Sequence, residues 1–178
     1  NDLGVDFVIC DHHLPSENLP KAIAVLDPKR GDCAYPFKEL CGCGIGFKLI
    51  QAVQQRMELP EKELFCYLDL VATAIAADIV PIIGENRILT FLGIEQLNLS
   101  PRVGLQFFLK SLKNPVSVTD LVFVIAPRIN GAGRIKHGSY AVSLLLSEVK
   151  EEALSRARAI ELFNSERKEL DQKITAQA

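Results

Sequence analysis

The sequence predicts an α/β fold with a partial parallel sheet, a predominantly helical remainder and a long connector helix at its end. Three observations lead to this class. Two short, β-branched apolar segments lie near the start, most later segments carry apolar residues at helical spacing, and residues 150–175 are rich in charge but contain neither glycine nor proline. Because two strands alone make a marginal sheet, we expect further strands upstream of Asn1 in a longer parent protein.

The first two elements are predicted to be buried strands. Residues 5–10 and 22–26 are short, apolar and rich in β-branched side chains. Asp27-Pro28 ends the second strand, because proline cannot donate to a ladder and restricts the residue before it. We expect residues 29–43 to form a loop.

The remaining elements are predicted to be helices, because apolar residues recur in them at helical spacing. The segments are 44–57, 61–77, 85–97, 102–113, 120–125, 140–147 and 150–175. Residues 61–77 are apolar on most sides, which is typical of a buried helix, whereas 127–138 are expected to form a Gly-rich loop. The last segment has a thin apolar stripe that suits a link between domains. We therefore divide the chain into a domain of residues 1–148 and a connector helix of residues 149–178 that leads to a second domain.

Composition limits the kind of protein this can be. The chain has 178 residues, 48% of them apolar, which is enough to bury a core. A formal net charge of −2 excludes a basic nucleic-acid-binding module by composition alone. No run reaches the roughly 18 uncharged apolar residues that a membrane span needs, so we expect no membrane association. Five cysteines, an odd number, predict reduced thiols and a cytoplasmic location.

The clearest candidate for chemistry is Asp11-His12-His13, which directly follows the first strand. Ligands gather at the carboxyl ends of strands in open α/β sheets, and these side chains suit Mn²⁺, Mg²⁺ or Zn²⁺. The alternative is that Asp11 caps a turn and the histidines are ordinary loop residues. Asp78 ends an apolar helix, where a carboxylate is costly unless it is paired or bound to a metal. A turn aspartate before Pro81 explains Asp78 equally well.

Three further motifs carry weaker signals. The glycines of residues 42–46 favour a tight entry into a helix over a phosphate loop, because neither Walker A nor the dinucleotide spacing is present. The cysteines of residues 33–43 fit no common zinc pattern and are better explained as small buried apolar residues. Arg128, Asn130 and Arg134 lie on a Gly-rich segment, where they could bind phosphate or belong to a solvated turn.

Four segments together resemble the DHH phosphoesterase family, in the order the family has them, over about residues 1–150. They are Asp11-His12-His13-Leu14-Pro15, residues 42–48, Ala76-Ala77-Asp78-Ile79-Val80-Pro81 with Glu85-Asn86-Arg87, and residues 127–134. The last two are most similar to the family's single-stranded-DNA exonucleases. The resemblance implies a two-metal site for Mn²⁺ or Mg²⁺ and 5′-to-3′ hydrolysis of single-stranded DNA in repair and recombination.

The resemblance also implies roles for individual residues. His12 and Asp78 would be metal ligands, and Asp11 and His13 would complete or orient the site. Arg128, Asn130 and Arg134 would lie near the phosphates of single-stranded DNA. The aspartate-rich motifs that precede the Asp-His-His segment in the family find no match in the chain, nor does the family's second domain. We therefore expect this chain alone to hold part of the metal site and to have little activity.

Two other functions stay open from the sequence. A phosphoesterase of the same family could act on short oligonucleotides, nucleotides or pyrophosphate. A non-catalytic binding domain could keep the fold without turnover, although the presence of all four candidate metal ligands argues modestly against it.

Overall fold

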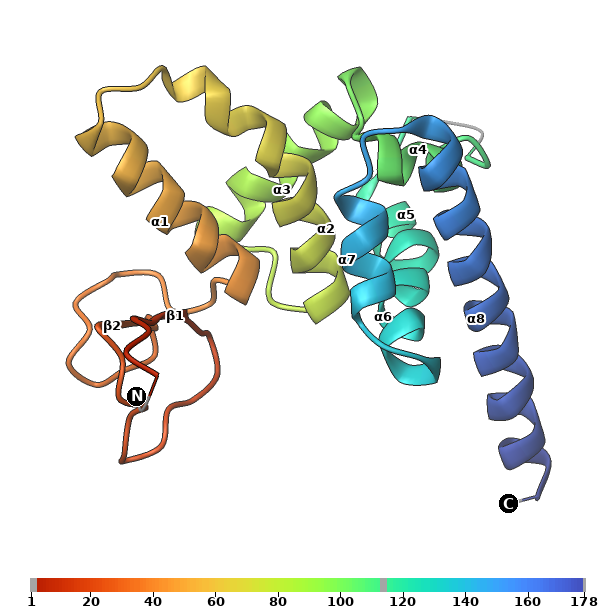
Figure 1. Cartoon of the computed structure of the whole chain (residues 1–178), viewed down its shortest axis with the longest axis horizontal. Coiled ribbons are helices and arrows are strands. Elements are labelled where there is room, and N and C mark those ends of the chain that lie inside the picture. The colour runs from red at the N-terminus through yellow and green to blue at the C-terminus, as the bar shows by residue number, and fades with distance from the viewer. Residues whose placement is uncertain (1–2, 113–114, 178) are drawn as a thin grey trace. The chain divides into compact units, whose positions relative to one another are not determined.

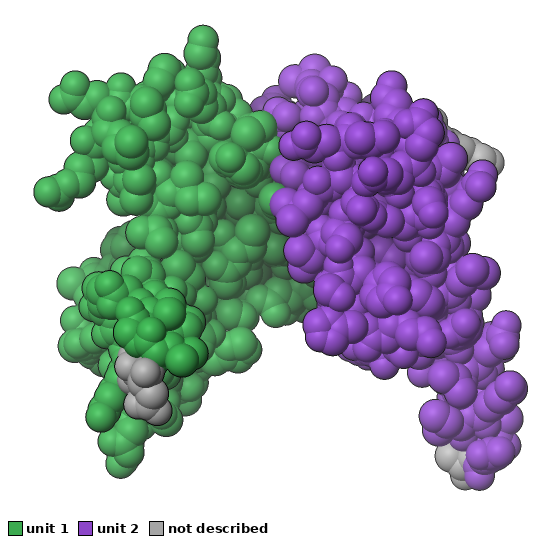
Figure 2. Space-filling model, in the orientation of Figure 1, with its two compact units in different colours: residues 1–93 green, residues 94–178 purple. Residues whose placement is uncertain are grey.

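Figure 1 shows a computed structural model of the chain, which describes residues 3–112 and 115–177. The chain forms two compact units, Asn1–Gly93 and Ile94–Ala178, which are coloured separately in Figure 2. The first unit contains a small parallel sheet and helices, and the described part of the second is helical. The predicted class, a partial parallel sheet with a mostly helical remainder, is therefore confirmed.

The sheet consists of β1 (Val8–Cys10) and β2 (Ala24–Leu26), which run parallel with Val8 opposite Ala24 and Cys10 opposite Leu26. Both strands are shorter than predicted, and the expectation that they are buried is wrong, since Val8 is 52% exposed. The strand residues that pack on the helical core are Cys10 and Leu26, the last of each strand. The core therefore covers the carboxyl ends of the strands and leaves their beginnings open.

Three helical segments and the start of a fourth complete the first unit. They are α1 (Gly42–Arg56), the 3₁₀ segment η1 (Glu61–Tyr67), α2 (Leu68–Asp78) and α3 (Gly84–Leu99). The predicted helix of residues 61–77 is thus two segments, because a tight 3₁₀ turn begins after Pro60. Helix α1 starts at Cys41, whose Sγ accepts a hydrogen bond from the Gly44 amide at 3.3 Å. The buried core of the unit includes Leu40, Cys41, Ile45, Phe47, Leu64, Leu68, Val71, Ile75 and Leu89.

Helices α2 and α3 cross at Gly93 with almost no space between them. A Cβ atom added to Gly93 would lie 2.3 Å from the Leu68 carbonyl oxygen and 2.5 Å from Cβ of Ala72. Real side chains essentially never make contacts this short, so only glycine fits this crossing. Because α2 ends at Asp78, the crossing also fixes the element that presents this carboxylate.

The second unit contains the end of α3 and six further segments. They are α4 (Val103–Leu109), α5 (Val118–Asp120), the π-helical η2 (Leu121–Ile125), α6 (Ala126–Ile135), α7 (Ser139–Leu145) and α8 (Lys150–Gln177). Ser117 caps α5 in a reciprocal capping box with Asp120, so helical structure begins two residues before the predicted helix of residues 120–125. The predicted helix 102–113 ends at Leu109, and its last position lies outside the described residues.

The Gly-rich segment is mostly helix α6, so the prediction of a loop at 127–138 is wrong. Glycine disfavours helix formation by only about 1 kcal/mol, which tertiary packing can offset. Gly131 is buried, and a Cβ there would meet Asn164 and Arg167 of α8 at 3.7–3.8 Å. Helix α6 therefore packs against α8 at this position, and this tertiary contact outweighs the low helix propensity of its glycines.

Helix α8 packs on its unit through one narrow stripe, which follows the predicted apolar stripe at its start but not at its end, where Leu170 and Ile174 are exposed. The buried positions are Ala153, Ala157, Ile160 and Asn164, which recur at helical spacing along one face. No described helix is long and apolar enough to cross a membrane.

Candidate metal centre

The structure brings His12 and Asp78 together. His12 follows β1 and Asp78 is the last residue of α2, and His12 Nε2 lies 3.1 Å from Asp78 Oδ2. The His12 side chain is 15% exposed and that of Asp78 is 41% exposed, so the pair is open to solvent on the carboxylate side. Two candidate ligands that are far apart in sequence thus meet at the carboxyl end of a parallel strand, where α/β folds place ligands.

Asp11 and His13 form a separate pair. Oδ1 of Asp11 accepts hydrogen bonds from the His12 and His13 amides at 2.7 and 3.2 Å and lies 2.7 Å from Nδ1 of His13. The hydrogen bonds from the side chain and amide of His13 lower the pKa of Asp11, so this carboxylate is ionised over a wider pH range. Asp11 therefore shapes the turn that presents His12, which matches the turn-capping alternative.

Backbone conformation also shapes the Asp78 side of the site. Ile79, directly after Asp78, has φ 57° and ψ 33°, a left-handed conformation that costs a β-branched residue about 1–2 kcal/mol. The loop ends at Gly84, which is also left-handed and packs so closely on the Phe37 ring that a Cβ would lie 2.7 Å from it. Strained backbone persists only where surrounding contacts hold it, and here it borders a candidate ligand.

The donor types suit a divalent ion. Imidazole nitrogen and carboxylate oxygen are both ligands that Mn²⁺ accepts. His12 Nε2 and Asp78 Oδ2 lie 3.1 Å apart, a direct contact that brings both donors to one point. No group of three or more His, Cys, Asp or Glu side chains is arranged to hold a metal ion within residues 3–112 and 115–177. The described chain therefore offers two converging donors, and the remaining ligands would be water, substrate or other protein groups.

The structure separates the roles of the two arginines in the Gly-rich segment. Arg128 makes two hydrogen bonds to Glu161 of α8, at 2.6 and 2.7 Å, and one to the Val124 carbonyl at 2.6 Å. Its guanidinium also lies 5.6 Å from the centre of the Phe108 ring. Arg128 thus holds α6 against α8 and caps the π-helical segment before it.

Arg134 differs from Arg128 in its surroundings. It lies in the last turn of α6, is exposed, and makes no side-chain hydrogen bond or ion pair with the residues that the structure describes. Asn130 lies one turn earlier on the same helix and is also exposed. Of the three residues predicted near phosphates, Arg134 is the one whose charge is available to a ligand.

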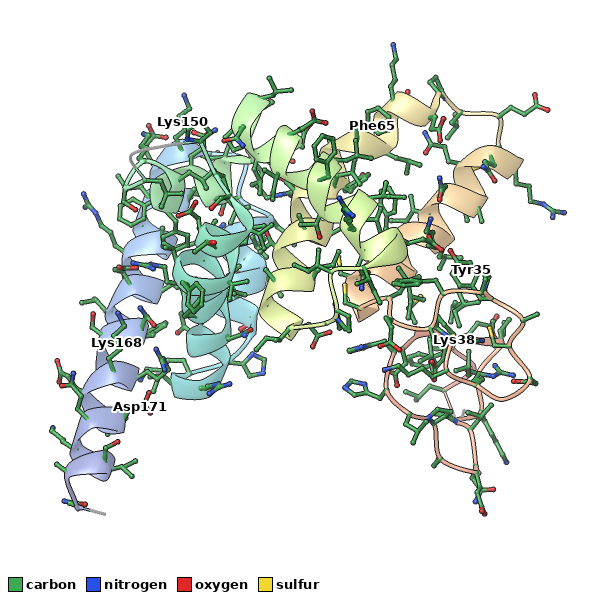
Figure 3. The ribbon with its side chains drawn as sticks, turned by 180° about the vertical axis from the view of Figure 1, so that it is seen from behind. Tyr35, Lys38, Phe65, Lys150, Lys168 and Asp171 are labelled. Atoms are coloured by element: carbon green, nitrogen blue, oxygen red, sulfur yellow. The ribbon has the colours of Figure 1, made fainter. Side chains whose placement is uncertain are left out.

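Sequence reasoning missed a cluster at the start of α3. Both carboxylate oxygens of Glu85 accept from the Tyr35 hydroxyl, at 2.8 and 2.9 Å, and one lies 2.6 Å from Nζ of Lys48. Burial and the hydrogen bond to Glu85 raise the pKa of Tyr35 to about 12, so Tyr35 stays a donor at neutral pH. Tyr35 and Lys38 lie in the long loop before α1 (Figure 3). In the sequence, Glu85 was visible only in the Glu85-Asn86-Arg87 segment of the family resemblance, with no signal that linked it to Tyr35 or Lys48.

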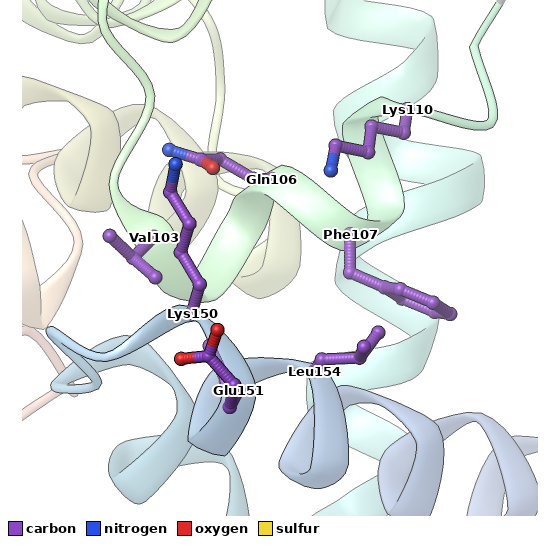
Figure 4. Close-up of a pocket in the computed structure, with 8 residues that line it drawn as sticks. Val103, Gln106, Phe107, Lys110, Lys150, Glu151 and Leu154 are labelled. Carbon is purple, nitrogen blue, oxygen red and sulfur yellow. The ribbon is translucent and has the colours of Figure 1, made fainter.

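Two hollows lie away from the predicted site residues. One, of about 220 Å³, is a mainly apolar space in the first unit between the end of β2, the long loop and α1, and Tyr35 and Lys48 are among the residues that line it. The other, of about 150 Å³, lies in the second unit between α4 and α8 (Figure 4). It is lined by Val103, Gln106, Phe107, Lys110, Lys150, Glu151, Ala153 and Leu154. Neither contains a residue that the sequence predicted for the site.

The five cysteines form no disulfide and differ in accessibility, which gives a testable pattern. Cys41 is 1% exposed, and burial raises the pKa of its thiol, whereas Cys43 and Cys66 are exposed. Because the thiolate is the reactive form, we expect iodoacetamide at pH 8 to label Cys43 and Cys66 well before Cys41. Peptide mass spectrometry after timed labelling measures this order. Equal labelling of Cys41 in the folded protein would contradict the buried N-cap.

The chain is similar to proteins of known families. The family described as "DHH family, N-terminal domain" matches residues 1–75. The chain is 40% identical over 180 residues to the single-stranded-DNA-specific exonuclease RecJ of Bacillus subtilis, covering 99% of this chain and 22% of that protein. It is 34% identical over 191 residues to the RecJ of Escherichia coli, covering 99% of this chain and 33% of that protein.

Solved structures agree with this match. RecJ from Thermus thermophilus in complex with Mn²⁺ superposes with a TM-score of 0.88 at 29% identity, covering 99% of this chain and 26% of that one. An exonuclease RecJ bound to manganese gives 0.87 at 30% identity, covering 98% and 44%. The chain thus spans between about a fifth and a third of the length of the two curated relatives from Bacillus subtilis and Escherichia coli.

Proposed function

We propose that this chain, whose residues 1–75 match the N-terminal domain of the DHH family, takes part in the metal-dependent hydrolysis of single-stranded DNA. The reaction is the release of nucleotides in the 5′-to-3′ direction, as in repair and recombination. The observation that carries the proposal is the meeting of His12 Nε2 and Asp78 Oδ2 at 3.1 Å beside the end of β1. The names of the relatives, which are single-stranded-DNA-specific exonucleases, support the substrate.

In this proposal, His12 and Asp78 hold Mn²⁺ or Mg²⁺, and the ions supply an activated water and neutralise charge on the phosphate. Asp11 keeps the turn in place through its bonds to the two amides that follow it. Nδ1 of His13 is engaged by Asp11, which leaves Nε2 of the same ring as the atom that would bind a metal or a phosphate. The metal charge makes a chain with a formal net charge of −2 compatible with a polyanionic substrate.

Arg134 is the proposed phosphate contact on α6, with Asn130 beside it. Each phosphate contact to a single strand contributes about 0.7 to the slope of log affinity against log salt. We expect Arg134→Gln to weaken binding of single-stranded DNA and to lower this slope by about that amount. Fluorescence anisotropy with a labelled oligonucleotide at several salt concentrations measures both.

The control for this prediction is Arg128→Gln. The charge of Arg128 is already balanced by Glu161, so this variant is expected to lower thermal stability and to change the salt slope less. A larger loss of slope with Arg128→Gln than with Arg134→Gln would restore Arg128 as the principal phosphate contact.

We also propose that residues 149–178 act as a connector helix and that the protein is cytoplasmic. The exposure of nearly all α8 side chains after Asn164 supports the first. The five free thiols support the second, because thiols stay reduced in that compartment.

The experiment that tests the proposed function gives the intact protein single-stranded DNA, duplex DNA, short oligonucleotides and pyrophosphate, each with Mn²⁺ and with chelator. Release of mononucleotides from the single strand alone, lost with chelator, is the expected result. A 5′ label against a 3′ label decides the direction of cleavage. Turnover of pyrophosphate or short oligonucleotides alone would replace the exonuclease by a small-substrate phosphoesterase, and no turnover would favour a binding domain.

A further inference from the structure

Asn86 connects the two loops that flank the candidate metal centre. It lies in the first turn of α3 and is fully buried, at 0% exposure. Its Nδ2 donates to the Glu39 carbonyl at 2.6 Å and to the Pro81 carbonyl at 2.9 Å. Both acceptors are backbone atoms of loops, so the side chain connects two segments that are not joined by β-sheet hydrogen bonds. We propose that Asn86 is a positioning residue that sets the separation of His12 and Asp78, an inference that rests on the proposed function of this pair.

The Glu39 side of this link leads to His12. Glu39 lies two residues before Cys41, the N-cap of α1, and Gly42 begins that helix. The His12 ring lies against this backbone, since a Cβ added to Gly42 would be 3.6 Å from Cδ2 of His12. Any shift of the loop at Glu39 would therefore move the surface on which the His12 ring rests.

The Pro81 side leads to Asp78. Only Ile79 and Val80 separate the two residues, and Ile79 holds the strained left-handed conformation described above. The Ile79 side chain is 83% exposed, so its own packing does not hold the strain. The hydrogen bond from Asn86 to Pro81 is a contact on this loop that can hold it in place.

The hydrogen bonding of Asn86 suits a role in positioning the two loops better than a role in stabilising the fold. A neutral hydrogen bond stabilises the fold modestly, while a buried acceptor without a partner opposes folding. Oδ1 of Asn86 is such an acceptor, with no donor among the described residues. The side chain is therefore not optimised for stability, although its two bonds from Nδ2 fix the geometry of both loops. The neighbouring Glu85 anchors the same turn of α3 through Tyr35 and Lys48.

The test compares Asn86→Ala with Gln54→Ala in the intact protein. Gln54 is a matched control, because it is also a buried amide in the first unit that donates to a proline carbonyl, that of Pro60, at the other end of α1. Binding of Mn²⁺ is followed by electron paramagnetic resonance of the free ion, alongside thermal unfolding. Outer partners of metal ligands typically change metal affinity by about 10–100-fold. We expect Asn86→Ala to raise the Mn²⁺ Kd by at least about 10-fold and Gln54→Ala to leave it nearly unchanged.

Further readouts separate the possible failures. If Asn86→Ala does not fold, Asn86→Ser, which keeps one hydrogen-bond donor, tests the positioning role in its place. We expect its Mn²⁺ Kd to lie between those of the wild type and Asn86→Ala. Turnover should show a lower kcat with an unchanged KM for DNA. Equal Mn²⁺ affinity in wild type and folded Asn86→Ser, or an equal loss in Gln54→Ala, overturns the positioning role. His12→Ala tests the premise: if it leaves Mn²⁺ affinity unchanged, the proposed metal centre fails and the role of Asn86 fails with it.

Discussion

Replacing Asp78 with asparagine, or His12 with alanine, is expected to lower metal-dependent turnover of single-stranded DNA by about 1,000-fold, which is about 4 kcal/mol in the activation barrier. Each change removes one of the two donors that converge at 3.1 Å. Asp78→Asn keeps the shape of the side chain and removes its charge, so the loss would report on metal binding and not on packing. Initial rates with labelled DNA at several Mn²⁺ concentrations measure the effect.

The chain offers matched controls for both variants. His137 is exposed and bonded to Ser139, and Asp32 is exposed and bonded to Arg30. His137→Ala and Asp32→Asn are expected to leave turnover within about twofold, because surface substitutions away from special features change little. Near-native circular dichroism of Asp78→Asn together with full activity would remove Asp78 from the mechanism.

Introducing a methyl group at Gly93 is expected to destabilise the protein by about 3 kcal/mol, because overpacking a tight crossing forces backbone to move. The added Cβ would lie 2.3 Å from the Leu68 carbonyl oxygen, and a backbone atom of a helix cannot give way cheaply. For a chain of this size, such a loss lowers the unfolding midpoint by about 10 °C. Differential scanning calorimetry of Gly93→Ala measures it.

Gly46→Ala is the control for this substitution. Gly46 lies inside α1, and a Cβ there would have no atom within 4 Å. Alanine favours a helix interior by about 0.5–1 kcal/mol over glycine, so this variant is expected to gain stability. An unchanged midpoint for Gly93→Ala would show that α2 and α3 separate easily and would remove the crossing as a support for Asp78.

The helices could be predicted because a period of 3.6 residues is visible in one sequence, and α1, α3, α7 and α8 lie close to their expected bounds. The error at α6 arose because glycine content reports local propensity, whereas the helix is held by tertiary contact with α8. The strands were placed correctly in sequence, but their exposure depends on which surfaces the core reaches. The pattern of apolar residues in one sequence does not show which distant segments pack together.

The site shows the same division between local and distant signals. Asp11-His12-His13 was visible as a motif, and the residues around it suggested a strand end. The partner of Arg128 is Glu161, a residue on another helix with no local signal to connect the two. Asn86 was visible only as part of the Glu85-Asn86-Arg87 segment of the family resemblance, because its proposed role depends on two backbone carbonyls in distant loops. A side chain that hydrogen-bonds to distant backbone carbonyls has no characteristic residue spacing, so one sequence does not reveal it.

Helix α8 has buried positions only as far as Asn164, although it continues to Gln177. One continuous helix therefore has two regimes of local stability: a part held by its unit and a part held mainly by its own hydrogen bonds. Isolated helical segments of this length are marginal in water. The last three turns should unfold and refold locally many times for each opening of the packed part. The same helix is therefore rigid where it packs on α6 and flexible beyond that contact.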